Sequence, residues 1–275
     1  MRTIGVVTVG RSDYSFYLPI LREMQREPGL AVHLIVSGAH LSPEFGLTVR
    51  MIEGDGFTVG SRVEMLLSSD SPEGIAKSMG VGLIGFAQAY AQIRADLLLV
   101  LGDRFEMHAA ALAALPFTIP VAHIHGGETT EGVIDEQVRH AVTKLAHLHF
   151  TAAEPFRRRL VLMGEDPRRV FCTGAPGLDG IARAGRIPQR ELLAALGLPP
   201  ALGRFGLVTY HPVTLSPGTA GKDARELAAA LDAVDGVFWV ITLPNAEAER
   251  VPPVGLAARQ QFRRRLLQFT IADER

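Results

Sequence analysis

The chain has 275 residues, of which 47% are hydrophobic and 21% are charged, with 28 lysines and arginines against 29 aspartates and glutamates. A formal net charge of −1 gives no electrostatic basis for binding nucleic acid or an anionic membrane, so any cationic site must be local. Cys172 is the only cysteine, which excludes a disulfide framework and a cysteine-based zinc cluster.

The N-terminal residues enter a strand-like run directly, without an apolar stretch followed by a small-residue cleavage site. No apolar run approaches the ~20 residues needed to span a bilayer. We therefore expect a cytoplasmic protein without a signal peptide or a membrane segment.

Short runs rich in branched apolar residues alternate along the chain with longer segments of helical spacing. The short runs predict strands at Ile4–Val9, Val32–Val36, Leu97–Leu101, Val121–His125, Leu148–Ala152, Val170–Thr173, Phe205–Tyr210 and Val237–Leu243. The longer segments predict helices at Phe16–Arg26, Glu73–Arg94, Arg104–Ala114, Asp135–Ala146, Glu154–Met163, Glu191–Leu196 and Lys222–Val234. Because several strands are apolar throughout, the pattern predicts an α/β fold with parallel sheets covered by helices.

The proline-containing segment Gly174–Leu202 predicts a linker with short helices between two lobes. We expect a first lobe over residues 1–174, then the linker and the start of a second lobe over residues 175–275. Only two clear strands follow the linker, and the last residues lack the strand pattern seen upstream. The second lobe is therefore expected to be incomplete or altered at its end, because two strands bury too little apolar surface.

Polar residues and glycines follow several of the predicted strands, at the edge where parallel sheets bind ligands. These segments are Gly10–Ser15, Gly102–Arg104, Gly126–Glu128, His211-Pro212 and Pro244-Asn245. Arginine, histidine, asparagine and helix N-termini suit phosphate, whereas aspartate and glutamate suit proton transfer. The pattern favours a site for a phosphorylated ligand beside acid–base groups.

Some of these residues also have structural interpretations. Gly5–Ser12 matches the P-loop spacing superficially, but arginine replaces the lysine and the first glycine lies inside the strand. Arg11 is either a phosphate ligand or part of a surface ion pair. Asp103 could cap the following helix, with Glu106 at the capping-box position.

His123 and His125 alternate on a predicted strand and are expected on the same face. No third ligand follows at a spacing typical of metal sites, so a metal is not expected. Hydrogen bonding near the site is the favoured interpretation of these histidines.

The segment His123–Lys144, which begins His-Ile-His-Gly-Gly-Glu, carries a specific family resemblance. Supporting motifs in family order are Gly10–Ser15, Gly102–Arg104, Gly174–Asp179, His211–Thr214 and Pro244–Ala246. Together they resemble the hydrolysing UDP-N-acetylglucosamine 2-epimerases of bacterial sialic and legionaminic acid biosynthesis.

The resemblance implies two Rossmann-like lobes of the GT-B type, with UDP held mainly by the second lobe. It implies no metal and no redox cofactor, and a homodimer as the assembly. The implied reaction is anti elimination of UDP from UDP-N-acetylglucosamine, followed by addition of water. The products are UDP and the free sugar epimerised at carbon 2, N-acetylmannosamine.

Matching the motifs residue by residue identifies the catalytic candidates Asp103, His125, Glu128 and Asp135. We assign the elimination half to Asp103 and leave the other roles open. The candidates for contacts with the nucleotide or diphosphate are Arg11, Ser15, Arg104, His211 and Asn245.

His125 departs from the pattern of some relatives, which have a catalytic glutamate at this position. Branches with histidine there include enzymes whose substrate is a UDP-linked 4,6-diacetamido-trideoxy sugar. His125 is therefore an acid–base candidate, and both kinds of sugar nucleotide are candidate substrates.

Two alternatives to an active epimerase are a GT-B glycosyltransferase and an inactive remnant of the epimerase. Relatives continue well beyond the length of this chain, where a Gly-Asn-Ser-Ser-Ser-Gly type loop and a following glutamate grip UDP. This chain lacks a matching loop. The resemblance therefore implies weak binding of the UDP-sugar.

Overall fold

A computed structural model describes residues 1–275 except 70, 184, 201, 211–219, 243–265 and 270–275. The chain divides into two compact units, residues 1–184 and residues 185–275. Each unit contains a parallel β-sheet and helices, which confirms the α/β fold expected from the alternating pattern. No helix in the described ranges is both long enough and apolar enough to cross a lipid bilayer.

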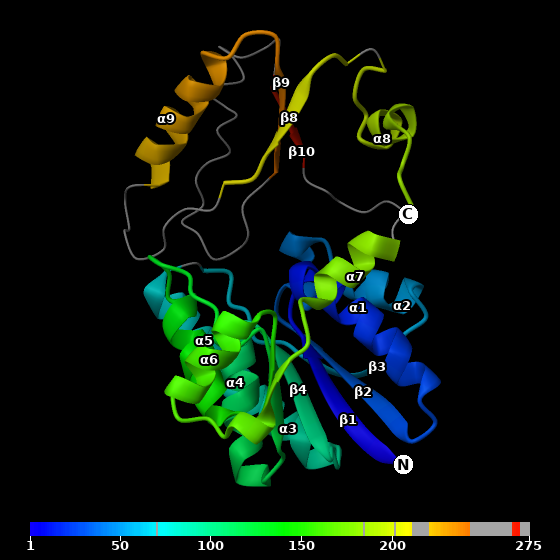
Figure 1. Ribbon diagram of the computed structural model, residues 1–275, viewed down its shortest axis with the longest axis vertical. Coiled ribbons are helices and arrows are strands. Elements are labelled where there is room, and N and C mark those ends of the chain that lie inside the picture. Colours follow the sequence, from blue (N-terminus) through cyan, green and yellow to red (C-terminus); the bar gives the residue numbers. More distant parts are fainter. Residues whose placement is uncertain (70, 184, 201, 211–219, 243–265, 270–275) are drawn as a thin grey trace. The chain divides into compact units, whose positions relative to one another are not determined.

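The first unit is built on a seven-stranded parallel sheet with the order β3-β2-β1-β4-β5-β6-β7 (Figure 1). Its strands are β1 (Arg2–Thr8), β2 (Leu30–Ser37), β3 (Val59–Val63), β4 (Leu97–Leu101), β5 (Val121–Ile124), β6 (Leu148–Thr151) and β7 (Val170–Cys172). Its α-helices are α1 (Arg11–Arg26), α2 (Val49–Gly54), α3 (Pro72–Gln92), α4 (Phe105–Ala114), α5 (Asp135–Leu145), α6 (Glu154–Leu162) and α7 (Pro176–Arg183). Short 3-10 turns lie at Gly38–Leu41, Pro43–Phe45, Leu115–Phe117 and Pro167–Arg169.

The order of the strands reverses between β1 and β4, which pair in parallel with Ile4 opposite Leu97. From β1 the chain runs outward to β3, then returns to β4 and continues in the other direction to β7. Ligands of open parallel sheets bind beyond the strand ends at such a switch point. The loops after β1, β4 and β5 are therefore the expected location of a site.

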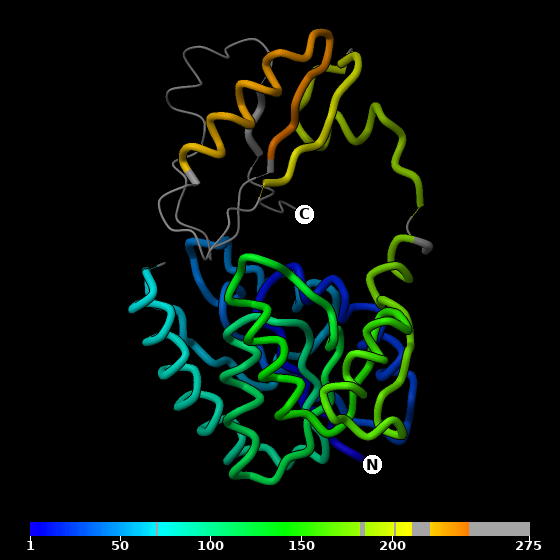
Figure 2. Tube along the Cα trace, turned by 60° about the vertical axis from the view of Figure 1, so that its left-hand side comes forward, coloured from blue at the N-terminus to red at the C-terminus, as the bar shows by residue number. Residues whose placement is uncertain are grey.

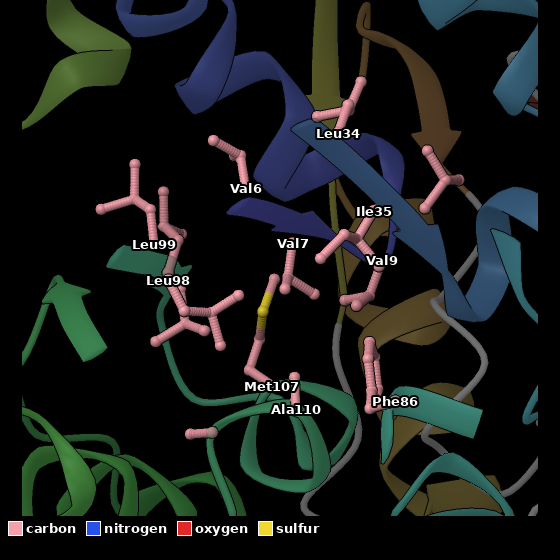
Figure 3. Packing of buried hydrophobic residues seen from close by; sticks show 14 of the residues in the cluster. Val6, Val7, Val9, Leu34, Ile35, Phe86, Leu98, Leu99, Met107 and Ala110 are labelled. Carbon is pink, nitrogen blue, oxygen red and sulfur yellow. The ribbon is translucent and has the colours of Figure 1, made fainter. Parts of the chain in front are cut away.

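The core of the first unit joins the central strands to the helices on them, and Figure 3 shows the part that includes Phe86 and Met107. Val6 and Leu98 are fully buried in the sheet, and Phe86 and Met107 are fully buried on the two helices. In such close packing, replacing a buried methionine or leucine with alanine lowers the free energy of unfolding by about 2–5 kcal/mol. The site loops thus extend from a rigid base.

The local sequence pattern does not predict α2 or β3. β3 is an edge strand in which Gly60, Ser61 and Arg62 interrupt the apolar run. Its strand conformation is stabilised by pairing with β2. α2 has only six residues, too few for a helical period to stand out.

The segment expected as a linker contains α7, which packs against α1. A Cβ atom on Gly177 would overlap the Phe16 ring, so the two helices meet closely at this glycine. The boundary between the compact units accordingly follows residue 184.

The second unit contains α8 (Gln189–Ala195), β8 (Phe205–Val208), α9 (Ala220–Asp232), β9 (Phe238–Thr242) and β10 (Leu266–Phe269). Its sheet is parallel, with the order β10-β9-β8. α9 lies along β9, where the Trp239 indole donates to the Leu231 carbonyl at 3.0 Å (Figure 2). β10 corrects the expectation of only two strands after the linker, because Leu266–Phe269 pairs with β9 through its backbone.

Candidate active site

The turn after β1 is held by the buried carboxylate of Asp13. This carboxylate accepts hydrogen bonds from the Gly10 amide at 2.7 Å, the Val9 amide at 3.0 Å and the Thr8 hydroxyl at 2.6 Å. Arg11 begins α1 inside this turn. The carboxylate therefore fixes the backbone from which the Arg11 side chain extends.

A buried hydrogen-bond chain continues from this turn to His40. The Thr8 hydroxyl lies 2.9 Å from Nε2 of His40, whose Nδ1 lies 2.7 Å from the Thr48 hydroxyl. Burial lowers the pKa of His40 to about 4 and raises the pKa of Asp13 to about 6. Sequence reasoning did not select either residue. Asp13 could have been found, because it lies three residues after Gly10, where a carboxylate reaches back to the first amides of a helix.

The turn after β4 presents Asp103. Gly102 has a φ of 79°, and Asp103 forms an ion pair with Arg139 on α5. The alternative in which Asp103 caps the next helix does not hold, because Arg104 occupies the N-cap position, without a side-chain cap. Glu106, expected to complete a capping box, is fully buried and pairs with Arg104 at 2.7 Å.

Arg139 connects two of the site loops through α5. Besides Asp103 it contacts Glu136 at 3.0 Å and donates to the Thr130 hydroxyl at 2.8 Å. Only 4% of the Arg139 side chain is exposed, against 28% for Asp103, so the carboxylate keeps one open side. Sequence reasoning did not select Arg139 or Glu136, although their spacing of three on a helix is typical of an ion pair.

The loop after β5 brings His125 and Glu128 together. Nδ1 of His125 lies 2.6 Å from Oε1 of Glu128. Among the described residues, Nε2 of His125 has no hydrogen-bond partner although it is buried. β5 ends at Ile124 and His125 has a φ of 66°, so strand alternation with His123 does not set the direction of its side chain.

Two glycines lie between His125 and Glu128 for steric reasons. At Gly127, which has a φ of 82°, a Cβ atom would lie 2.5 Å from the carbonyl oxygen of Phe156. At Gly126 a Cβ atom would lie 3.0 Å from Nδ1 of His123. The Gly-Gly pair is therefore required by the close approach of this loop to α6 and β5.

The structure describes Ser15 and Asp135 among the other residues selected from the sequence. Ser15 is exposed on α1 and donates to the Ser12 carbonyl at 2.7 Å. Asp135 is the first residue of α5 and is half-buried. His211 and Asn245 lie outside the described residues.

Asp103 and His125 come from neighbouring positions at the same edge of the sheet. Leu101 pairs with Ile124 in the sheet, and the Gly102 amide donates to the Ile124 carbonyl at 2.9 Å. The ring of Phe16 on α1 lies 5.6 Å from the His125 ring. The loops after β4 and β5 therefore meet beside α1, with carboxylates and an imidazole at the switch point of the sheet.

A family model described as UDP-N-acetylglucosamine 2-epimerase matches residues 22–268. The chain belongs to this family. It is 34% identical over 246 residues to a GDP/UDP-N,N'-diacetylbacillosamine 2-epimerase (hydrolyzing) of Campylobacter jejuni, covering 90% of this chain and 64% of the relative. It is 38% identical over 213 residues to a UDP-N,N'-diacetylbacillosamine 2-epimerase (hydrolyzing) of Legionella pneumophila. That match covers 78% of this chain and 56% of the relative. The chain thus spans about three fifths of the length of these relatives.

Solved structures of epimerases share the fold. The S. aureus MnaA–UDP structure superposes with a TM-score of 0.77 at 16% identity, covering 97% of this chain and 68% of the other. The UDP-GlcNAc 2-epimerase of Neisseria meningitidis bound to UDP-GlcNAc superposes with a TM-score of 0.76 at 15% identity, covering 98% and 72%. These similarities confirm the expected GT-B type of fold with Rossmann-like lobes.

In the described ranges, no group of three or more histidine, cysteine, aspartate or glutamate side chains is arranged to hold a metal ion. The residues that the structure does bring together are instead arranged in hydrogen-bonded pairs, Asp103 with Arg139 and His125 with Glu128. Such pairs orient acid–base groups.

Proposed function

We propose that the chain is a hydrolysing 2-epimerase of a UDP-linked amino sugar, with the nucleotide of N,N'-diacetylbacillosamine as its substrate. The observation that carries the proposal is the His125–Glu128 pair after β5, at the strand end next to the β4 turn that carries Asp103. This choice of sugar follows the identities of 34% and 38% to the two diacetylbacillosamine enzymes. The identity is 28% to the UDP-N-acetylglucosamine 2-epimerase of Neisseria meningitidis and 33% to a probable one of Ralstonia nicotianae. UDP-N-acetylglucosamine is the second candidate.

In the elimination half, Asp103 removes the proton from carbon 2 of the sugar. The electron pair of that C–H bond forms the double bond to carbon 1 as the anomeric C–O bond breaks and UDP leaves. Arg139 holds one side of the carboxylate, so the base is oriented before the substrate binds. The sugar intermediate is a glycal with an acetamido group at carbon 2.

In the hydration half, His125 acts through Nε2. Glu128 accepts the hydrogen on Nδ1, which leaves the lone pair on Nε2 to take a proton from the attacking water. The hydroxyl of that water joins carbon 1, and Asp135 is the second carboxyl candidate for returning a proton to carbon 2. The released sugar has the inverted configuration at carbon 2.

The departing diphosphate needs cations and amide donors. Arg11 stands at the N-terminus of α1, a helix of 16 residues, where the helix dipole favours an anion. Arg104 is the second cation at this edge of the sheet, and family resemblance adds Ser15, His211 and Asn245. We further propose that the enzyme acts in the cytoplasm as a homodimer.

Proton NMR in heavy water tests the proposal directly. The chain is incubated without an acceptor, separately with UDP-N,N'-diacetylbacillosamine and with UDP-N-acetylglucosamine. The expected products are UDP and a free 2-epimeric sugar that carries deuterium at carbon 2, formed faster from the diacetamido substrate.

The other outcomes identify the alternatives. A UDP-linked 2-epimer would indicate a non-hydrolysing epimerase, and turnover only after addition of a sugar acceptor would indicate a glycosyltransferase. If the protein is folded but both sugar nucleotides stay intact, the chain is a non-catalytic remnant of the epimerase.

A further inference from the structure

His123 lies on β5 directly behind the candidate site, and none of the proposed steps uses it. Its side chain is fully buried. Nε2 lies 2.7 Å from the carbonyl oxygen of Gly102, and Nδ1 lies 3.3 Å from the hydroxyl of Thr143 on α5. Because the side chain is fully buried, any effect of His123 on the reaction acts through its neighbours, and these two hydrogen bonds are its directional contacts.

The two contacts determine the tautomer of the ring. Burial lowers the pKa of His123 to about 3, so the imidazole is neutral near pH 7 and carries one hydrogen. The Gly102 carbonyl can only accept, which places that hydrogen on Nε2. Nδ1 then accepts from the Thr143 hydroxyl.

Gly102 is held through both of its backbone polar groups by consecutive residues of β5. Its carbonyl accepts from His123, and its amide donates to the Ile124 carbonyl at 2.9 Å. Gly102 also has a φ of 79°, so hydrogen bonds on both sides clamp a sharp turn. Asp103 is the next residue, and the clamp therefore determines where its carboxylate starts.

We infer that His123 is a positioning residue, which holds the Gly102–Asp103 turn so that the Asp103 carboxylate faces the carbon it deprotonates. The contact with Thr143 extends the clamp to α5, one helical turn from Arg139, which holds the carboxylate itself. α5 thus holds the Asp103 side chain directly through Arg139 and supports the preceding Gly102 backbone through Thr143 and His123. The catalytic part of this inference rests on the proposed function.

Two substitutions separate the hydrogen bond from the packing. His123→Gln places an amide donor near the former Nε2, whereas His123→Leu fills the space without a donor. His33→Leu is the matched control, because His33 is also a histidine on a strand. Its Nε2 lies 2.9 Å from the Ser61 hydroxyl, and it stands on β2, three strands away from β5. The three variants are compared with the wild-type chain.

In steady-state kinetics, His123→Leu is expected to lower kcat about 10–100-fold, with KM changed less than about twofold, because orientation and not binding is lost. His123→Gln should recover kcat to within about threefold of wild type. In hydrogen exchange, the peptide containing Gly102 should exchange about tenfold faster in the Leu variant only, since the turn loses the hydrogen bond from His123. His33→Leu should change neither measurement.

Unchanged kcat and unchanged exchange at Gly102 in His123→Leu would overturn the inference. Equal losses in the Leu and Gln variants would also overturn it, since packing alone would then explain the effect. If the wild-type chain converts neither sugar nucleotide, the proposed function fails, and the exchange rates still decide whether His123 holds the turn.

Discussion

Nδ1 of His125 lies 2.6 Å from Oε1 of Glu128, three residues further along the chain. A pair this close in sequence needs a tight turn, and the positive φ of His125 together with the two glycines produces it. The pair occupies Nδ1, and among the described residues the buried Nε2 of His125 has no hydrogen-bond partner. Under the proposed function, His125 exchanges the proton and Glu128 orients its ring.

This division is testable by kinetics. His125→Phe keeps the ring contact with Phe16 and removes both nitrogens, so kcat should fall about 10²–10⁴-fold. Glu128→Ala should lower kcat less, about 10–100-fold, and should add little in the double variant because the two residues act as a unit. The assay is release of UDP from the sugar nucleotide. Glu131→Ala, an exposed acid in the same loop, is the control expected to keep wild-type kcat; additive losses in the double variant would contradict the pair.

Asp103→Asn tests the elimination half. The amide keeps the size of the side chain but cannot take the proton, so kcat should fall about 10³-fold or more. NMR in heavy water should show that deuterium no longer appears at carbon 2 of substrate or product. The matched control is Glu154→Gln, a half-exposed acid on α6. Deuterium incorporation at the wild-type rate in Asp103→Asn would assign the base to another residue.

Arg139→Met leaves the Asp103 and Glu136 carboxylates without their shared buried cation. Because the partners are 28% and 23% exposed, water screens part of the loss, and we expect about 2–4 kcal/mol of destabilisation. Arg158→Met is the control: that arginine is 76% exposed beside Glu154, and its removal should cost under about 0.5 kcal/mol. Urea unfolding followed by circular dichroism measures both. Equal stabilities would show that the buried pair contributes nothing net.

Buried neutral histidines should make the fold sensitive to acid. The pKa of His123 is about 3 in the folded chain, below the usual value of 6.5, so the unfolded chain binds the extra proton as the pH falls. The contribution of His123 is complete above about pH 6.5 and should fall by about 2 kcal/mol between pH 7 and pH 5. His123→Gln lacks this titration, so urea unfolding at the two pH values should show a smaller loss for the variant by that amount. A loss equal to that of wild type would mean that His123 is not neutral in the fold.

Local pattern was enough to predict most of the first unit. Leu97–Leu101 is apolar in every position, and such a run is stable only where both faces are covered, as in a parallel sheet. Because parallel strands end at one edge, the residues following them, among them Asp103 and Glu128, could be selected as site candidates without coordinates. The short edge strand β3 and the strand β10 escaped this reasoning, since pairing with a neighbour determines them.

The amino-acid sequence by itself determined the α/β class, the strand ends that carry polar groups and the family resemblance. Only the tertiary structure decided which groups act together. Asp103 pairs with Arg139, 36 residues further along the chain, and Thr8 contacts His40, 32 residues further along. Local periodicity in the sequence does not predict such pairings. The physical reason is that hydrogen bonds and burial, which orient a carboxylate or shift the pKa of a histidine, depend on neighbours brought together by folding.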